Sequence, residues 1–112
     1  MSNMDAETRN ALVASIEHWK DNERAEDPWK VFIRSDTCAL CILFVNRTPA
    51  CSGCPVSSLT GVSGCNKTPW IDASRSLRDW RHWPDSEQFR DLFRERARAM
   101  REFLEAILKE ET

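Results

Sequence analysis

The five cysteines of this 112-residue chain are the residues whose type and spacing point most directly to chemistry. Cys38 and Cys41 form a C-x2-C pair, nine residues follow, and Cys51 and Cys54 form a second such pair. Each tight turn presents two sulfurs to one ion, and two turns complete a tetrahedral site with Zn–S distances of about 2.3 Å. The spacing therefore predicts a structural zinc site whose ligands are Cys38, Cys41, Cys51 and Cys54.

The ligand set and the metal each have an alternative. Cys65 follows Cys54 after ten residues, and with five thiols for four positions it can replace Cys51. His18 is a further candidate ligand if the first helix packs beside the cysteines, although a lone histidine more often makes a hydrogen bond. An iron–sulfur cluster is the alternative cofactor because Pro55 follows Cys54 as in bacterial ferredoxins. The compact C-x2-C-x2-C-x3-C spacing of those proteins is absent, so zinc is favoured.

The residue patterns of known catalytic sites are missing from the sequence. Four thiolates fill the coordination sphere of zinc and leave no position for a reactive water. The H-x-E and P-C-x-x-C pattern of zinc deaminases is absent, since Pro49 stands one residue too early before Cys51 and His18 is followed by Trp19 and Lys20. A glycine-rich phosphate loop and a nucleophile elbow are also absent. We therefore expect a protein that is not an enzyme.

The elements that position the cysteines are expected to be helices. Residues 1–26 are the predicted N-terminal helix, residues 36–68 the cysteine-rich metal segment, residues 68–83 a second helix and residues 85–110 a C-terminal helix. The cysteine-rich segment has too few large apolar side chains to fix its own shape, so a bound metal has to order it. The sequence predicts one mainly α domain, residues 1–112, in which three helices surround a zinc-clamped loop segment with little or no β structure.

Capping residues mark where these helices begin. Ser2 and Asp5 are spaced like a capping box, Thr68 is an expected N-cap, and the D-S-E-Q run that starts at Asp85 offers another cap. Two short runs, Trp29–Ile33 and Cys41–Val45, have the composition of strands.

Apolar residues that recur at helical spacing mark the faces expected to be buried. They are Leu12, Val13, Ile16 and Trp19 in the first helix, Trp70, Ala73, Leu77 and Trp80 in the second, and Phe89, Leu92, Phe93, Met100, Phe103, Leu104, Ile107 and Leu108 in the third. A second face of the first helix is small and polar and is expected to accept another packed element: Ala11, Ser15, His18 and Asn22. Most of the five tryptophans are expected to lie in the core.

Charge is distributed unevenly along a chain whose formal net charge is -2. From residue 74 to 101 there are eight arginines and five acids, a balance of +3, whereas residues 1–36 carry five bases and eight acids, a balance of -3. The acidic total argues against a generally basic nucleic-acid binder. Arginine and tryptophan are the residues that dominate protein interfaces, so a protein partner is expected to contact Arg78, Arg81, Trp83 and Arg94.

The same arginines have two other interpretations. They can contact phosphates with a tryptophan stacked on a base, which makes a nucleic-acid-binding zinc regulator the alternative function. They can also belong to a solvated helix face in which Asp91 and Glu95 pair with arginines three or four residues away.

The sequence has no apolar run long enough to span a bilayer, and its start, MSNMDAETRN, is acidic and polar, unlike a secretory leader. We therefore expect a cytoplasmic protein with no membrane partner. Cytosolic thiols are kept reduced, which favours a metal site over disulfides, and the odd number of cysteines points the same way.

Several sequence blocks together resemble a group of small cysteine-rich proteins of tailed bacteriophages and prophages. The blocks are SIEHWKDN at 15–22, CALC at 38–41, CSGCPV at 51–56, TG at 60–61, CNKTPW at 65–70 and A-x-x-x-x-E-F-L at 97–104. The resemblance covers nearly the whole chain and implies that Cys65, His18, Trp19 and Asn22 belong to the group's pattern. Trp70 departs from it, since relatives tend to carry tyrosine there. The resemblance brings no established activity, but it implies a setting in the cytoplasm of a bacterial host.

The expected function follows from these observations taken together. A saturated metal site and the lack of a catalytic pattern indicate a non-enzymatic, metal-stabilised phage accessory protein that binds a host or phage macromolecule. Counter-defence and host takeover are the roles expected for such a protein.

Overall fold

The structure is a computed structural model, and it describes residues 4–33, 39–44, 54–56 and 68–110. These residues contain the helices α1 (Ala6–Asn22), α2 (Ala39–Phe44), α4 (Trp70–His82) and α5 (Glu87–Glu110) and the 3-10 helix η1 (Pro28–Lys30). No strand occurs within the described ranges. The predicted mainly α class is therefore confirmed for this part of the chain.

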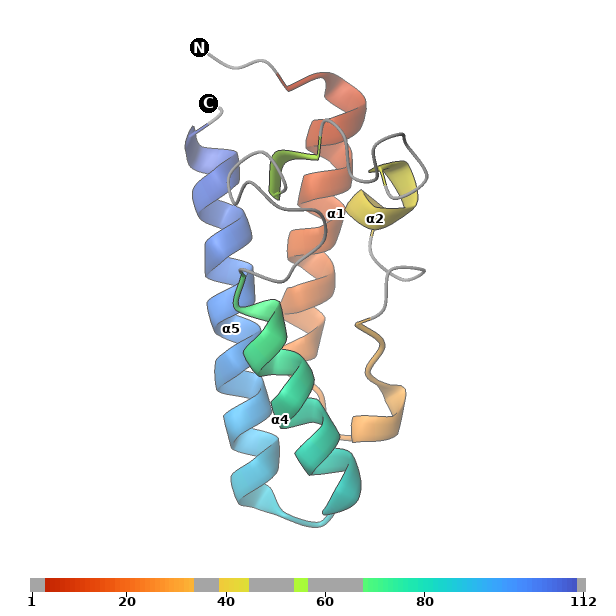
Figure 1. The fold of residues 1–112 in the computed structure, drawn as a ribbon, viewed down its shortest axis with the longest axis vertical. Coiled ribbons are helices and arrows are strands. Elements are labelled where there is room, and N and C mark those ends of the chain that lie inside the picture. The colour runs from red at the N-terminus through yellow and green to blue at the C-terminus, as the bar shows by residue number, and fades with distance from the viewer. Residues whose placement is uncertain (1–3, 34–38, 45–53, 57–67, 111–112) are drawn as a thin grey trace.

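Helix α5 is the longest of these helices, and both α1 and α4 pack against it. In Figure 1, α1 lies beside the upper part of α5 and α4 beside its lower part. Helix α2 contacts α1, and η1 contacts α4. Among the described helices, none is both long enough and apolar enough to cross a membrane.

A side-chain hydrogen bond to the backbone lies at the start of each of the three long helices. The Asp5 carboxylate accepts a hydrogen bond of 2.7 Å from the Thr8 backbone N–H, so Asp5 is itself the N-cap of α1. The Thr68 hydroxyl accepts from the Trp70 N–H at 3.1 Å, and the Ser86 hydroxyl accepts from the Phe89 N–H at 3.2 Å. The N-cap of α4 is Pro69, one residue after the expected Thr68, and it makes no side-chain cap hydrogen bond. The cap expected in the D-S-E-Q run is confirmed at Ser86, whereas Ser2 lies outside the described residues.

The buried apolar side chains form one core between the helices. Trp80 of α4 and Phe93 of α5 are almost fully buried, and their ring centroids lie 5.7 Å apart. The core comprises Leu12, Ile16, Trp19, Val31, Leu40, Phe44, Cys54, Val56, Ala73, Leu77, Trp80, Phe93, Ala97, Met100, Leu104 and Ile107.

The predicted core faces are confirmed in most positions. Val13 is an exception: 38% of it is exposed, because it lies off the stripe that Leu12 and Ile16 share. Ala97 is buried although its small side chain gave no periodic signal. The other expected core residues that the structure places only half in the core are Trp70, Phe89, Leu92, Phe103 and Leu108.

The strand expected at Cys41–Val45 is wrong as far as Phe44, where the described residues end, since Ala39–Phe44 is helix α2. Leu40 and Phe44, four residues apart, are both buried, and Ile42 between them is 63% exposed. Buried residues four positions apart lie on one face of a helix. In a short run where nearly every residue is apolar, composition alone does not distinguish this helix from a strand.

The strand expected at Trp29–Ile33 is also wrong. The segment begins in η1 and continues as irregular chain, although Val31 has extended backbone angles. An extended segment becomes a strand only when a neighbouring strand pairs with its backbone groups. Here side chains from α1 and α4 bind the carbonyl groups in place of a neighbouring strand.

The small polar face of α1 is covered, as expected. Ser15 and Asn22 are buried, and the His18 ring Nε2 donates a hydrogen bond of 2.6 Å to the carbonyl oxygen of Phe32. The element packed beside His18 is therefore the chain that follows η1.

Candidate functional site

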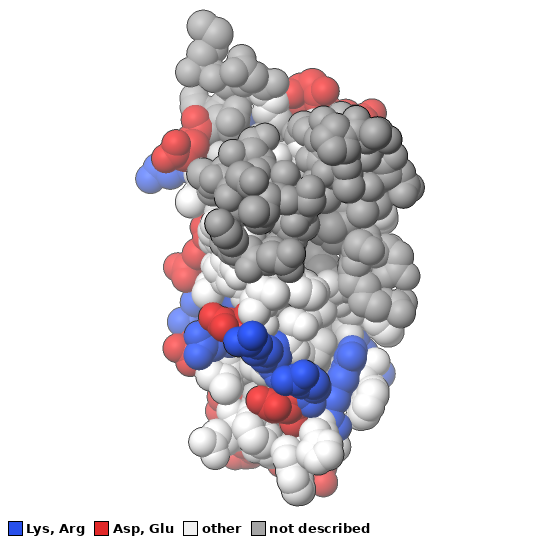
Figure 2. All heavy atoms as spheres, in the orientation of Figure 1, with Lys and Arg blue, Asp and Glu red and all other residues white. Residues whose placement is uncertain are grey.

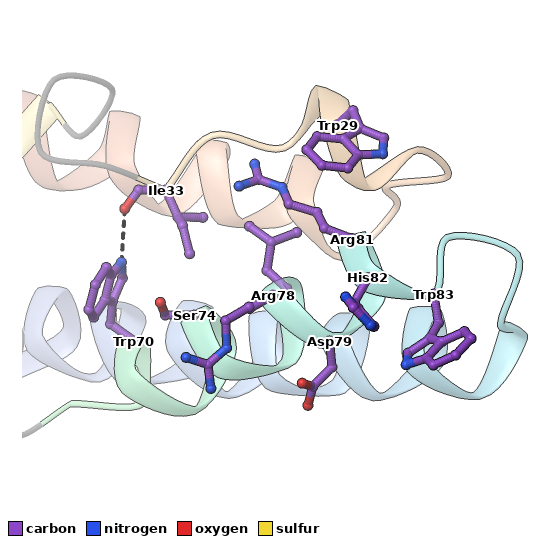
Figure 3. Close-up of a pocket in the computed structure, with 10 residues that line it drawn as sticks. Trp29, Ile33, Trp70, Ser74, Arg78, Asp79, Arg81, His82 and Trp83 are labelled. Atoms are coloured by element: carbon purple, nitrogen blue, oxygen red, sulfur yellow. Dashed lines mark hydrogen bonds between the residues drawn. The ribbon is translucent and has the colours of Figure 1, made fainter.

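A groove of about 900 Å³ runs between α4 and the segment from Trp29 to Ile33. Figure 3 shows the two walls facing each other, with Trp70 at one end of the groove and Trp29 and Trp83 toward the other. The residues that line it are Trp29, Ile33, Trp70, Ser74, Leu77, Arg78, Asp79, Arg81, His82 and Trp83.

Side chains from α4 and α1 hold the wall formed by residues 28–33. Arg81 donates from Nε to the Pro28 carbonyl at 3.0 Å and from Nη2 to the Val31 carbonyl at 2.6 Å. Trp70 Nε1 donates to the Ile33 carbonyl at 2.9 Å, and His18 binds the carbonyl between them, that of Phe32.

These contacts follow the geometry of an extended chain. Successive carbonyls of such a chain point to opposite sides, so those of Val31 and Ile33 reach α4 while that of Phe32 reaches α1. The segment is thereby fixed from both sides, and the groove has a wall whose position depends on three side chains of the helices.

Trp29 is held at the mouth of the groove with most of its surface in solvent. The Asp27 carboxylate accepts from the Trp29 backbone N–H at 2.9 Å and fixes the turn. The Arg81 guanidinium carbon lies 5.5 Å from the centroid of the Trp29 ring, a cation–π distance. The indole nevertheless remains 62% exposed.

Trp83 is the second exposed tryptophan of the groove. Its backbone N–H donates to the Asp79 carbonyl at 3.0 Å and ends α4, and its ring packs edge-on against His82 at 5.1 Å. The side chain is 59% exposed. Trp19 and Trp80 are buried and Trp70 is packed half-buried against the core, as expected for most of the tryptophans, whereas Trp29 and Trp83 are exposed.

Three of the four expected partner-binding residues lie together in the groove. Arg78 and Trp83 are exposed and line it. Arg81 lines it too, but its guanidinium is engaged by the chain's own carbonyls. Arg94 is not among the lining residues: it is half-buried on α5 and donates from Nε to the Ala25 carbonyl at 2.8 Å.

The other arginines of residues 74–101 mostly make internal contacts. Arg101 binds Glu23 through two nitrogens and also Glu105 at 2.5 Å, and the hydrogen bond to Glu23 raises the pKa of its guanidinium above the usual value. Arg98 lies 3.7 Å from Glu23. The remaining ion pairs of this stretch are Arg90 with Asp91 at 3.1 Å and Arg96 with Asp72 at 3.6 Å.

Four arginines of this stretch make no ion pair within the described residues: Arg75, Arg78, Arg81 and Arg94. Arg81 and Arg94 bind backbone carbonyls instead. The pairing of Asp91 or Glu95 with arginines three or four residues away does not occur there either, since Asp91 pairs with its neighbour Arg90. Figure 2 shows Lys and Arg side chains in a band over α5 and α4, with acidic atoms interspersed. The unpaired charge of this face is thus concentrated on α4.

The expected zinc ligands fall mostly outside the described part of the chain. Cys38, Cys51 and Cys65 lie there, and the structure does not describe the side chain of Cys41. Cys54 is buried in the core. Within the described ranges no three His, Cys, Asp or Glu side chains come together as a metal site, and His18 Nε2 is hydrogen-bonded to Phe32.

Comparison of the chain with protein-family models, with curated proteins and with solved structures found no match.

Sequence reasoning did not identify Trp29, Ile33 or Trp70 as residues of this site. The dipeptide Asp27-Pro28 before Trp29 is a turn signal in the sequence, but it does not show which element lies beside the turn. The contacts that bring residues 28–33 beside α4 span 37 to 53 positions of sequence. Helical periodicity carries no information about them.

Arg81→Lys is expected to lower the free energy of unfolding by about 1–2 kcal/mol. A lysine keeps the charge but cannot reproduce the fork that binds two carbonyls or the stacking on Trp29. Chemical denaturation followed by circular dichroism measures the change. Arg78→Lys is the matched control, since exposed Arg78 makes no such bonds within the described residues, and its effect should stay below about 0.5 kcal/mol. Equal stabilities of the two variants would contradict the role given to Arg81.

Proposed function

We propose that this chain is a non-enzymatic binding protein that takes up part of a partner protein in the groove between α4 and residues 28–33. The observation that carries the proposal is the exposure of two tryptophans, Trp29 and Trp83, at the rim of one groove beside Arg78. Tryptophan and arginine supply most of the binding energy at protein interfaces.

The rigidity of the groove supports this function. Trp29 is positioned by Arg81 and by the Asp27 turn, and the far end of the wall is bound by Trp70. Side chains that are already ordered lose little conformational entropy when a partner binds, which favours affinity. A protein that only needed to fold would gain stability by burying these two indoles.

The distribution of the arginines favours a protein partner over nucleic acid. Binding to a phosphate backbone gains affinity with each phosphate that a cation neutralises. Six of the eight arginines in residues 74–101 contact carboxylates or carbonyls of the chain itself: Arg81, Arg90, Arg94, Arg96, Arg98 and Arg101. On a chain of net charge -2, the two that remain are a weak basis for phosphate binding.

The cysteine pairs are proposed to hold a structural zinc ion that orders the middle of this protein. The spacing of Cys38, Cys41, Cys51 and Cys54 supports this, with Cys65 as the replacement ligand and an iron–sulfur cluster as the alternative cofactor. The core residues Leu40 and Phe44 flank Cys41, and Cys54 and Val56 are buried in the same core. A metal bound between the pairs would tie two chain segments that already share this core.

The setting we propose is the cytoplasm of a phage-infected bacterium. The sequence resemblance to small cysteine-rich phage proteins supports an accessory role there, in which the bound partner is a host or phage protein. Occupying a host protein in this way would block a defence or redirect a host process.

Trp83→Ala is expected to raise the Kd for the partner by about 30-fold or more, the effect of losing an aromatic contact that contributes about 2 kcal/mol to binding. The tagged chain is purified from infected cells, the co-purified protein is identified by mass spectrometry, and its affinity is measured with the two purified components. Ile42→Ala is the matched control, because Ile42 is 63% exposed on α2 and is not among the groove residues.

Equal affinities of the wild type, Trp83→Ala and Ile42→Ala would remove the groove as the binding site. Retardation of generic DNA or RNA at low salt that weakens steeply with added salt would support the nucleic-acid function in its place.

A further inference from the structure

The groove is bordered by cations that have no charge partner in the described part of the chain. Arg78 and Arg81 line the groove, and Lys30 and Arg75 are next in sequence to its lining residues Trp29 and Ser74; Lys30, Arg75 and Arg78 are exposed. None of them makes an ion pair within the described ranges. This end of an acidic chain therefore carries a local excess of positive charge.

Acidic groups offset this excess only in part. Asp79 is the one acid among the described residues that line the groove. Asp72, at the start of α4, lies 3.6 Å from Arg96 of α5 and forms an ion pair with it. In Figure 3 the Arg78 guanidinium extends toward Ser74, on the side of the groove nearer to Trp70, whereas Asp79 lies toward His82. The Trp70 end is thus the end where an anion is favoured.

The floor beside Arg78 is apolar. Leu77 is buried, and Ile33 and Trp70 are half-buried. The indole N–H of Trp70 is already bonded to the Ile33 carbonyl, so the ring presents only apolar surface to a ligand. Such a floor favours an aromatic or large aliphatic side chain, which loses its contact with water there.

We infer that the partner occupies the groove with an acidic segment that also carries a large apolar residue. This inference rests on the proposed protein-binding function and names the chemistry of the partner. The planar guanidinium of Arg78 binds a carboxylate of the segment through two parallel N–H···O bonds. The apolar residue packs on Leu77, Ile33 and Trp70, and the exposed faces of the rim tryptophans cover the segment. Lys30 and Arg75 attract it over a longer range.

A library of random short peptides displayed on yeast tests the inference without knowledge of the partner. The full-length wild type, Arg78→Glu and Arg9→Glu are each used to select binding peptides, and the selected peptides are sequenced. Arg9 is exposed on α1 and is not a groove residue, so Arg9→Glu makes the same charge change elsewhere. The wild type and Arg9→Glu should select peptides that combine Asp or Glu with an aromatic or large aliphatic residue. Arg78→Glu should select peptides with Lys or Arg in place of the acid.

Affinities measured with one selected peptide complete the test. Arg78→Glu should weaken its binding about tenfold, and Arg9→Glu should leave it unchanged. Unfolding midpoints of both variants that match the wild type show that neither effect comes from misfolding.

The possible failures are distinguishable. Two results would overturn the inference of an acidic segment and leave the proposed function intact. In the first, the selected peptides depend on Trp83 but lack acids. In the second, Arg78→Glu selects the same peptides as the wild type. Peptide binding that neither Trp83→Ala nor Arg78→Glu weakens would overturn both the inference and the proposed function. If an equimolar single-stranded oligonucleotide displaces the peptide from the wild type but not from Arg78→Glu, that result would show that the groove binds phosphates.

Discussion

Removal of the proposed zinc ion by a chelator under reducing conditions is expected to abolish the cooperative unfolding of this protein. A structural zinc ion contributes on the order of 10 kcal/mol to folding, which equals the whole stability of many small domains. The purified chain should contain about one zinc ion, and its far-ultraviolet circular dichroism and melting temperature should both fall when zinc is withdrawn. Elemental analysis and thermal denaturation measure these changes.

Single cysteine variants separate the ligands from the spare thiol. Cys41→Ser and Cys51→Ser should lose zinc and stability, whereas Cys65→Ser should retain both, since Cys65 lies outside the two C-x2-C pairs. Loss of zinc in Cys65→Ser together with its retention in Cys51→Ser would identify Cys65 as the replacement ligand. A brown, iron-containing chain would indicate the cluster. A metal-free chain that melts as before would contradict the metal site altogether.

Trp80→Ala is expected to lower the free energy of unfolding by about 3–5 kcal/mol. Trp80 is 1% exposed and packs on Phe93 with ring centroids 5.7 Å apart, so truncation leaves a large cavity where α4 meets α5. Chemical denaturation followed by circular dichroism measures the loss. If the alanine variant does not fold, the milder Trp80→Phe is used, for which the expected loss of unfolding free energy is about 1–2 kcal/mol.

The matched control is Trp83→Ala, three residues further along the same helix end. Trp83 is 59% exposed, and its contribution to ending α4 comes from the backbone N–H. The control should therefore change the free energy of unfolding by less than about 0.5 kcal/mol. A stability of Trp80→Ala close to that of Trp83→Ala would mean that the contact of α4 with α5 does not depend on this indole.

The three long helices were predictable because local signals specify them, whereas the short helix α2 was expected as a strand. Asp5, Thr68 and Ser86 each accept a hydrogen bond from a backbone N–H two or three residues further on, at the start of a helix, and such bonds are encoded in adjacent sequence. The apolar stripe of the last helix recurs over several turns, so its buried face was also predictable.

The groove was less predictable because its contacts are distant in sequence. The arginines were recognised as a group, but composition does not reveal that Arg81 and Arg94 bind backbone carbonyls while Arg78 stays exposed. Likewise, Trp29 and Trp80 are the same residue type, yet one is mostly in solvent and the other is buried. Burial depends on which elements pack together, and this is a property of the tertiary structure.

The hydrogen bonds that helix side chains make to the backbone of residues 25–33 join parts of the chain that are far apart in sequence. His18 bonds to this segment across 14 positions, but the bonds from Trp70, Arg81 and Arg94 close loops of 37 to 69 residues. The entropy lost in closing such long loops is recovered only after α4 and α5 have formed and docked. The groove therefore requires α4 and α5 to be docked, so a ligand that fits it is expected to bind a folded chain and not a nascent one.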